Sequence, residues 1–337
     1  MAWAFTEDVG IYAGAVGKLL SAAPERNTVL LSVLASLTSA GPAAFGPEPP
    51  LLGWWPDTGP ASAAILQTPP HPLLMTGFPD GSAEALAREL ADRGTGLSRI
   101  AGAEHDAAAL ARVWRDLTGR TFHVSQRQRL YRLGRLIPPG PAPAGTPRVA
   151  AIADATLVRA WYSAFAAEAG TGEAPTALID ERLRAGLLML WEANGTERRA
   201  PDDSERPRGG SPDARAPDDS ERPRGGSPDA RAQDDSARPR GGSPEARAPD
   251  NREPVSLAAM TAVIAGTARI GPVYTPPQFR GRGYGSGVTA AITQLAERKG
   301  AESVILFTDL ANPTSNSIYR RLGYEPVEDR VLMTYDS

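Results

Sequence analysis

The spacing of apolar residues changes repeatedly along the second half of the chain, and these changes predict helices alternating with strands. Residues 303–308 contain a continuous apolar run of the length expected for a buried strand. Over residues 155–169, Leu157, Trp161 and Phe165 recur at the spacing of one helix face, so we expect this helix to bury them. The other predicted elements of this half are strands at 146–153, 187–192, 254–260, 262–276 and 330–335, and helices at 177–186 and 286–298.

The first half of the chain has a similar but less regular pattern. A proline-rich stretch at residues 138–145 separates the two halves and is predicted to be a stiff linker. Before it, turn-forming residues such as those at 57–60 separate short runs of strand-forming residues. The predicted elements are strands at 51–55, 62–68, 72–78, 97–101 and 121–133, and helices at 82–93 and 104–117.

A repeated segment interrupts the second half. The sixteen-residue unit at 200–215 recurs at 216–231 and, slightly altered, at 232–247. No large apolar residue occurs between 200 and 254, so this segment cannot bury enough surface to offset the entropy of ordering. Its charges are mixed, unlike the basic tails that bind nucleic acid. We expect a disordered insertion over 195–253 in a strand hairpin, with partner binding as the alternative.

A glycine-rich run lies where the strand ending near residue 276 gives way to the helix at 286–298. It reads Arg280-Gly281-Arg282-Gly283-Tyr284-Gly285. Glycines allow the backbone to approach a ligand closely, and the N–H groups at a helix N-terminus attract phosphate. The run lacks the lysine of a P-loop, and its alternating glycines do not fit the G-x-G-x-x-G fingerprint of dinucleotide-binding folds. The sequence therefore predicts a site for a different phosphorylated ligand.

Two motifs together resemble the GNAT N-acetyltransferases, which bind acetyl-CoA. Arg280-x-x-Gly283-x-Gly285 is similar to their pyrophosphate loop. About thirty residues later, Asn312, Tyr319 and Gly323-Tyr324 fall on a second family pattern, in which an Asn at a strand end precedes a short helix. The resemblance covers residues 146–337 and implies the α/β (α+β) GNAT acyl-CoA N-acyltransferase fold, a mixed, mostly antiparallel sheet flanked by helices.

The first half repeats the predicted order of this core, so the resemblance also implies a second, smaller GNAT-like domain. Its corresponding turn, at residues 78–81, has one glycine, and Asp80 there would repel a pyrophosphate. We therefore expect a degenerate domain at 1–137, the linker at 138–145, and the acetyltransferase domain at 146–337, interrupted by the insertion.

The resemblance implies an enzyme, an acyltransferase that passes the acetyl group of acetyl-CoA to a small-molecule or peptide amine by direct attack in a ternary complex. Tyr319 is the expected acid, because a phenol can return a proton to the departing thiolate. The competing interpretation is a non-catalytic acetyl-CoA sensor, which would need no proton donor there. Residues expected to hold acetyl-CoA are Val273, Tyr274, Thr275, Arg280, Gly281, Arg282, Gly283, Tyr284, Gly285, Ser286 and Asn312.

Other roles stay open at the level of sequence. Pro276 and the proline after it are expected to open the strand ladder to pantetheine, the arm of the cofactor. Asp309 ends the strand beside the expected cleft and Glu192 ends another strand; they are alternative bases, with water-mediated deprotonation as a third possibility. Trp161 and Trp191 fit either substrate contacts or core packing.

Composition narrows the remaining classes of function. The chain has 337 residues, enough for two domains, and no cysteine, which excludes a thiolate nucleophile or thiolate metal site. Its three histidines show no ligand spacing, so we expect no metal. A net charge of −3 gives no attraction to nucleic acid or a membrane surface, and no stretch approaches the ~20 apolar residues of a membrane span. With no leader pattern at Met1 and arginine far above lysine, we expect a cytoplasmic, bacterial protein.

Overall fold

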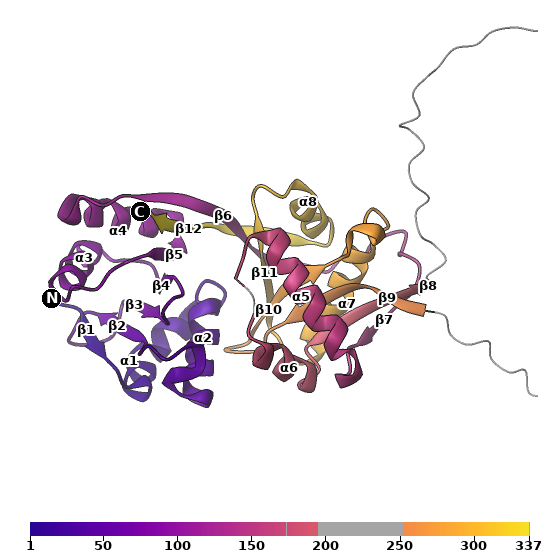
Figure 1. Cartoon of the computed structure of the whole chain (residues 1–337), viewed down its shortest axis with the longest axis horizontal. Coiled ribbons are helices and arrows are strands. Elements are labelled where there is room, and N and C mark those ends of the chain that lie inside the picture. Colours follow the sequence, from indigo (N-terminus) through magenta and orange to yellow (C-terminus); the bar gives the residue numbers. More distant parts are fainter. Residues whose placement is uncertain (173, 195–251, 337) are drawn as a thin grey trace, which may run out of the picture.

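The structure is a computed structural model that describes residues 1–172, 174–194 and 252–336. Each half of the chain forms one lobe, and the two lobes lie side by side along the long axis of the molecule (Figure 1). The twelve described strands form a single sheet through both lobes, in the order β1-β2-β3-β4-β5-β12-β6-β11-β10-β9-β8-β7. Two strands of opposite halves, β12 and β6, therefore lie together at its centre.

The N-terminal lobe begins with elements that the sequence analysis did not predict. Two helices precede the first predicted strand, and Tyr12, Val16 and Leu20 are buried at four-residue spacing on the first of them. That spacing could have predicted the helix from the sequence, although three glycines in the same segment lower its helix propensity. The elements are β1 (Ala4–Thr6), α1 (Val9–Ala22), α2 (Thr28–Ala40), β2 (Leu51–Trp55), β3 (Ala63–Gln67), β4 (Leu73–Met75), α3 (Ser82–Asp92), β5 (Arg99–Ala103), α4 (Glu104–Thr118) and β6 (Phe122–Leu133).

The C-terminal lobe repeats this order of strands and helices element by element. The fold class predicted from sequence is thus confirmed, and the two lobes are two copies of one arrangement. The elements are β7 (Thr146–Val149), α5 (Ala155–Ala169), α6 (Thr176–Arg184), β8 (Leu188–Asn194), β9 (Arg252–Met260), β10 (Thr267–Tyr274), α7 (Tyr284–Arg298), β11 (Ser303–Asp309), α8 (Pro313–Arg321) and β12 (Tyr324–Tyr335).

Several predicted boundaries in this lobe are corrected by the structure. The first strand is four residues shorter at its C-terminal end, and α7 starts at Tyr284 rather than at residue 286. The last strand starts at Tyr324 rather than at residue 330, because it pairs along most of β6. In α5 the fully buried face holds Val158, Tyr162 and Ala166, one position beyond the predicted residues, which flank it and are only partly buried.

The two long central strands exchange partners between the lobes. β6 comes from the N-terminal half, yet it pairs with β11 from Ile305 to Asp309. β12 comes from the C-terminal half, yet it pairs with β5 from Arg330 to Thr334. Tyr131 of β6 is accordingly buried in the C-terminal core, and Val331 of β12 in the N-terminal core. Each lobe is completed by a strand from the other.

The sheet of the C-terminal lobe is covered by helices on both faces. One core lies under α7 and α8 and includes Trp191, Ile270 and Tyr319. The other lies under α5 and α6 and includes Leu190 and Leu257. Residues next to each other on a strand face opposite helices, so side chains of β10 are divided between the two faces.

The predicted insertion lies between β8 and β9. The last pairs of this antiparallel hairpin join Ala193 to Glu253 and Asn194 to Arg252, so the chain leaves and re-enters at the tip of the hairpin. Residues 252 and 253, predicted to belong to the insertion, are part of β9. The sixteen-residue repeats themselves lie outside the described residues.

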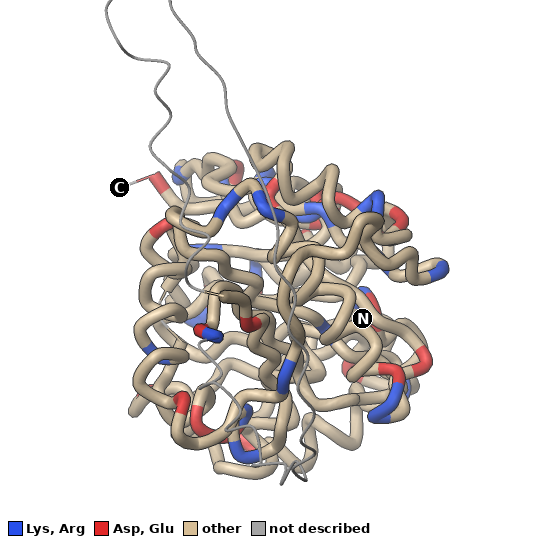
Figure 2. Tube along the Cα trace, turned by 90° about the vertical axis from the view of Figure 1, so that its right-hand side faces the viewer, with Lys and Arg blue, Asp and Glu red and all other residues tan. Residues whose placement is uncertain are grey.

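Charges of both signs are mixed over the described chain. Seen from the end of the C-terminal lobe, basic and acidic positions alternate over the backbone (Figure 2). Among the residues that the structure describes, no helix is both long enough and apolar enough to cross a membrane.

Candidate active site

A gap opens in the C-terminal sheet where β10 and β11 separate. The two strands pair in parallel only from Thr267–Ser303 to Ile270–Leu306. Both continue beyond that point, to Tyr274 and Asp309, without pairing to each other. The separation begins at Gly271, where β10 also shifts register against β9, and not at the prolines after Thr275 that were predicted to cause it. The gap leaves backbone groups of both strands available to a bound chain.

The glycine-rich run forms the turn from β10 into α7. Gly281 and Gly283 have φ angles of 79° and 80°, which residues with a Cβ rarely adopt. Gly283 is the N-cap of α7, and no side chain of the described residues caps this helix end. The N–H groups of the first turn have no partners within a helix, so they can bind an anion. This geometry fits a pyrophosphate held by the predicted amides.

The loop also packs closely against its surroundings. A Cβ at Gly285 would lie 3.4 Å from the hydroxyl of Thr275. A Cβ at Gly287 would lie 2.7 Å from the ring of Pro143, in the linker, and 3.0 Å from Trp191. The small residues therefore let the start of α7 sit directly on β8 and the linker. Trp191 donates its indole N–H to the carbonyl of Ala144 at 2.8 Å, so it is a core residue.

The two arginines of the loop have different surroundings. Arg280 donates its Nε to the carbonyl of Thr275 at 2.9 Å and forms an ion pair with Glu168 of α5 at 2.5 Å. Glu168 also accepts the hydroxyl of Tyr274 at 3.2 Å. Arg280 thus ties the loop to β10 and α5. Arg282 is partly exposed and makes no ion pair with the described residues, which leaves it as the loop arginine available to a phosphate.

The second motif forms α8 on the same face of the sheet as α7. Asn312 is its N-cap, and its side-chain oxygen accepts the N–H of Ser315 at 3.0 Å. This is the helix-starting role that the residue before a proline commonly takes. Tyr319 is 9% exposed and lies edge-on to Tyr324, with ring centroids 6.1 Å apart. Burial raises the pKa of Tyr319 to about 12.

The hydroxyl of Tyr319 makes no hydrogen bond to the described residues. Its neighbour Tyr324, in contrast, shares a 2.7 Å hydrogen bond with Thr293. A raised pKa keeps the Tyr319 phenol protonated at neutral pH, and an unpaired O–H can be offered to a bound molecule. The same burial makes the phenol a weaker acid than free tyrosine. Tyr319 is thus a neutral donor in the core that α7 and α8 share, and its role as the acid stays a prediction.

The acidic residues considered as bases lie in different places. Glu192 is held by Arg148 at 2.6 Å, on the β7–β8 side of the sheet away from β11. Asp309 ends β11 and accepts the N–H of Ala311 at 2.7 Å. Glu168, which the sequence analysis missed, lies at the end of α5 beside Tyr274. No motif marks it, because its place depends on a contact between residues 106 positions apart.

The aromatic residues of α5 also lie beside this end of β10. Trp161 is partly exposed and packs against Tyr274, with ring centroids 6.2 Å apart. Phe165, one turn further along, is likewise partly buried. Trp161 therefore stays compatible with a substrate contact, whereas Trp191 does not.

In the N-terminal lobe, a side chain of the same lobe lies at the corresponding gap. β4 and β5 pair in parallel through Leu73–Ile100 and Leu74–Ala101, and then separate as β10 and β11 do. Beyond β4, however, the N–H of Phe78 donates to the carboxylate of Asp106 at 3.1 Å. A side chain of the same lobe thus accepts a backbone N–H just beyond the end of β4. The expectation that Asp80 repels a phosphorylated ligand in this lobe stays a prediction.

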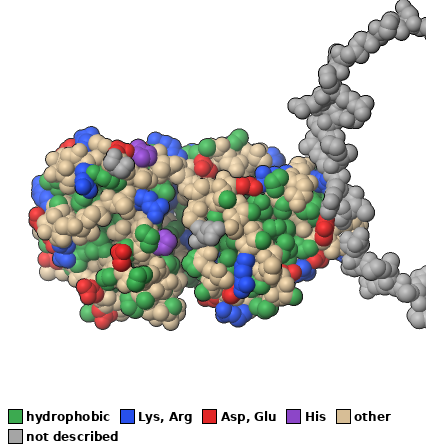
Figure 3. Space-filling model, in the orientation of Figure 1, with side chains coloured by type: hydrophobic (Ala, Val, Ile, Leu, Met, Phe, Trp, Pro, Cys, Tyr) green, Lys and Arg blue, Asp and Glu red, His purple; other side chains and the backbone are tan. Residues whose placement is uncertain are grey.

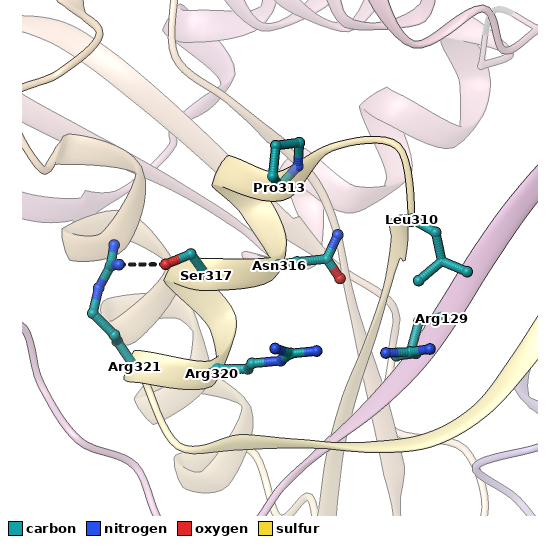
Figure 4. A pocket seen from close by; sticks show the side chains of 7 residues that line it. All are labelled: Arg129, Leu310, Pro313, Asn316, Ser317, Arg320 and Arg321. Atoms are coloured by element: carbon teal, nitrogen blue, oxygen red, sulfur yellow. Dashed lines mark hydrogen bonds between the residues drawn. The ribbon is translucent and has the colours of Figure 1, made fainter.

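A hollow of about 380 Å³ lies on the side of α8 that faces β6 (Figure 4). Its arginines have partners within the protein: Arg129 pairs with Asp329 at 2.6 Å, Arg320 reaches the hydroxyl of Tyr131 at 3.3 Å, and Arg321 donates to Ser317 at 2.5 Å. The hollow is separated from the β10–β11 gap by β11. The full lining is Arg129, Leu310, Pro313, Asn316, Ser317, Arg320 and Arg321.

Comparison with known proteins agrees with this geometry. Residues 251–332, which contain β10, the glycine loop and α8, match the model of the FR47-like protein family. A mycothiol acetyltransferase from Salinispora arenicola (strain CNS-205) is 40% identical over 63 residues, 18% of this chain and 20% of the relative. The matched part thus spans about a fifth of the length of the curated relatives.

Two solved structures extend the likeness to the whole chain. A GCN5-related N-acetyltransferase from Sphaerobacter thermophilus has a TM-score of 0.56 at 17% identity, covering 98% of this chain and 94% of that one. A tandem GNAT protein from the clavulanic acid biosynthesis pathway has a TM-score of 0.51 at 14% identity, covering 99% and 97%. At these identities the likeness shows the fold.

Fold and site together define the class: this chain has the GNAT acetyltransferase fold. Within it, residues 251–332 of the C-terminal lobe match the FR47-like family model, and the N-terminal lobe is a second, divergent copy of the same order of elements.

Proposed function

We propose that the C-terminal lobe transfers the acetyl group of acetyl-CoA to an amine. The observation that carries the proposal is the meeting of an open strand gap with an uncapped, glycine-lined helix N-terminus. The gap suits an extended arm such as pantetheine, and the helix end suits its pyrophosphate. The acceptor is a small-molecule or peptide amine, and the name of the mycothiol acetyltransferase relative supports the former.

The loop, the end of β10 and the start of α8 would each have a distinct role in this reaction. Acetyl-CoA supplies the activated acetyl group. The amides from Gly281 to Ser286 hold phosphate, with Arg282 adding positive charge at their edge. Backbone groups from Val273 to Thr275 orient the acetyl end in the gap, where an N–H directed at a developing oxyanion commonly contributes ~3 kcal/mol. Asn312 fixes the start of α8.

Proton transfer falls to two groups on opposite sides of the gap. Tyr319 lies under α8 on the α7 face and offers a neutral O–H to the leaving sulfur. On the α5 face, Glu168 forms an ion pair with Arg280 and is our candidate to receive the proton of the amine, directly or through water. This arrangement would keep the proton donor and the proton acceptor on opposite faces of the sheet.

The experiment that tests the proposal is isothermal titration of acetyl-CoA into the wild type and Gly283→Glu. We expect micromolar binding that is lost in the variant, because a side chain at a φ of 80° distorts the loop and its charge repels phosphate. Acetylation of amines, followed by release of the CoA thiol, should be lost in parallel.

Gly300→Glu is the matched control. Gly300 follows the other end of α7 and has a φ of 87°, and a Cβ added there would meet no described atom within 4 Å. The same backbone strain and charge are therefore introduced far from the loop. This variant should bind acetyl-CoA like the wild type. No binding by the wild type would contradict the proposal, and equal loss in both variants would show general destabilisation.

A further inference from the structure

Two arginines lie close together on the α5–α6 face of the sheet, without a carboxylate partner among the described residues. Arg269 is in β10, two residues before the strand gap opens, and its neighbours Ala268 and Ile270 face the opposite core. Arg182 is in α6, and its Nη1 donates to the hydroxyl of Tyr162 at 3.0 Å and lies 3.5 Å from the carbonyl of Gly271. The pair therefore borders the mouth of the gap.

The charge of Arg269 is not balanced by the described part of the protein. Its Nη1 is buried and has no hydrogen-bond partner in the described residues, and neither arginine forms an ion pair there. Burial, followed by repulsion from Arg182, lowers the pKa of Arg269 to about 10. Most buried charges are paired, because an unpaired buried charge is strongly destabilising. Both residues are partly accessible as a whole, whereas the Nη1 of Arg269 is not, so a carboxylate would reach that nitrogen only if the guanidinium shifts towards it.

Other arginine sites in the molecule lack this property. The hollow beside α8 contains three arginines, but each has an internal hydrogen-bond or ion-pair partner. Arg132, which pairs across the sheet in register with Ile305, has Glu25 at 3.7 Å. Among the described residues, Arg269 is the arginine whose buried guanidinium nitrogen has no hydrogen-bond partner.

We propose that Arg269 and Arg182 bind a carboxylate of the acceptor, so that the substrate is an amine that carries a carboxylate near its amino group. The proposal rests on the acetyl transfer proposed above and names its substrate class. A carboxylate can accept two N–H groups of one guanidinium and satisfy the buried Nη1. Because Arg182 also reaches Gly271, an anion held here would place a nearby amine at the gap.

The location agrees with an acceptor entering opposite the cofactor. The glycine loop and α8 lie on the α7 face, whereas the arginine pair lies on the α5–α6 face. On the side where α5 and α6 are seen, a hollow separates the two lobes (Figure 3). An amine could therefore reach the gap from this side without crossing the loop.

The first test measures binding without requiring turnover. Thermal unfolding of the full chain, with and without CoA, is followed in the presence of glycine, β-alanine or γ-aminobutyrate, each compared with its carboxamide, and of phosphoethanolamine. We expect at least one acid to raise Tm by about 2–4 °C and its amide to leave Tm unchanged. Arg269→Met and Arg182→Met should abolish the difference.

Arg184→Met is the matched control, because Arg184 is exposed on the same helix two residues from Arg182. It should keep the response to acids. Arg269→Met should also have a higher Tm than the wild type without ligand, since it removes an unpaired buried charge while keeping an unbranched side chain. A lower Tm would reveal a structural role for Arg269 and overturn the proposal.

The second test measures specificity. With acetyl-CoA as donor, we expect kcat/KM for the best acid to exceed that for its amide by about tenfold or more, mainly through KM, and Arg269→Met to remove the preference. Equal use of acids and amides, no Tm response to any acid, or a response that survives in Arg269→Met would overturn the carboxylate site. A response to phosphoethanolamine alone would assign the pair to a phosphate and overturn it too.

The carboxylate site and the acetyl transfer can fail independently in these experiments. Acetyl transfer without discrimination between acid and amide would leave the acetyltransferase standing and remove the carboxylate site. Conversely, absence of acetyl-CoA binding would remove the acetyltransferase, while an acid-specific Tm shift lost in Arg269→Met would still support the anion site.

Discussion

Tyr319 illustrates how one side chain can satisfy packing and chemistry at once. Its ring is buried among the residues under α8, while its hydroxyl has no partner in the described chain. The pKa of about 12 means that the phenol is neutral throughout the physiological range. It can therefore donate a proton only to a base formed nearby, such as a thiolate, and cannot act as a base itself.

This leads to a prediction for Tyr319→Phe. The ring and its packing are retained, so acetyl-CoA affinity should be unchanged, while kcat should fall by ~10²-fold. Because the pKa is raised, the wild-type phenol stays protonated, and the loss should be of similar size at every pH from about 7 to about 9.5. The measurement is the pH dependence of kcat for both proteins.

Tyr335→Phe provides the control, since Tyr335 is a phenol near the other end of the C-terminal strand, packed on Phe122. Its turnover should match the wild type. An unchanged kcat in Tyr319→Phe would assign Tyr319 to packing alone, and a loss that disappears at high pH would contradict a neutral donor.

At the scale of residues, the sequence could predict features that depend on the local backbone, such as the conformation of the glycine loop. Gly281 and Gly283 were expected to form a ligand loop, and both have φ angles that favour glycine. Arg280 was expected at a phosphate, which stays a prediction, and the structure adds a pairing with Glu168. That pairing, like the proximity of Arg182 and Arg269, joins segments far apart in sequence and has no local signature.

At the scale of elements, periodicity predicted most of the C-terminal lobe, and α5 was predicted with its observed boundaries. The buried face of α5 lies one position further along the helix than predicted, because Tyr162 takes the core position expected for Trp161. A tyrosine can bury its ring while its hydroxyl accepts a hydrogen bond from Arg182. β12 was half predicted, because polar residues such as Glu328 and Asp329 occupy strand positions next to β6.

The β8–β9 hairpin yields a prediction at this scale. Asn194 and Arg252 are paired at its tip, so a short turn can replace the intervening 195–251 without moving either strand. Because that segment is predicted from composition to contribute no core, the shortened protein should keep its Tm and its acetyl-CoA affinity. Thermal unfolding and titration check this.

A useful comparison is a variant of unchanged length in which a glycine-serine linker replaces the repeats. Loss of soluble protein in the shortened variant but not in the linker variant would show that the connection must be long. Loss in both would give the repeats themselves a role and contradict the hairpin interpretation.

At the scale of the whole molecule, the exchange of β6 and β12 could not be predicted. Each half has the complete order of one domain, and sequence alone assigns every strand to its own half. Only the pairing of β6 with β11 and of β12 with β5 shows that the cores are shared. The division at residues 137 and 146 remains a division of the chain more than of the folded cores.

The shared strands predict that the halves depend on each other. Residues 140–337 alone should be insoluble or self-associate, because β11 would lose β6 on one side and the core would lose Tyr131. Co-expressed with residues 1–139, the same fragment should copurify and bind acetyl-CoA. Size-exclusion chromatography of each fragment and of the pair provides the measurement; a monomeric 140–337 with native affinity would contradict the dependence.

The exchanged strands also set how substrates can be selected. β6 and β12 are each twelve residues long, and both run from one lobe into the other. A hinge movement that opens the lobes would have to break the hydrogen bonds between β6 and β12. We therefore expect the opening between the lobes to keep a fixed width. Molecules too broad for this opening would be excluded by their shape, with the N-terminal lobe forming its opposite side.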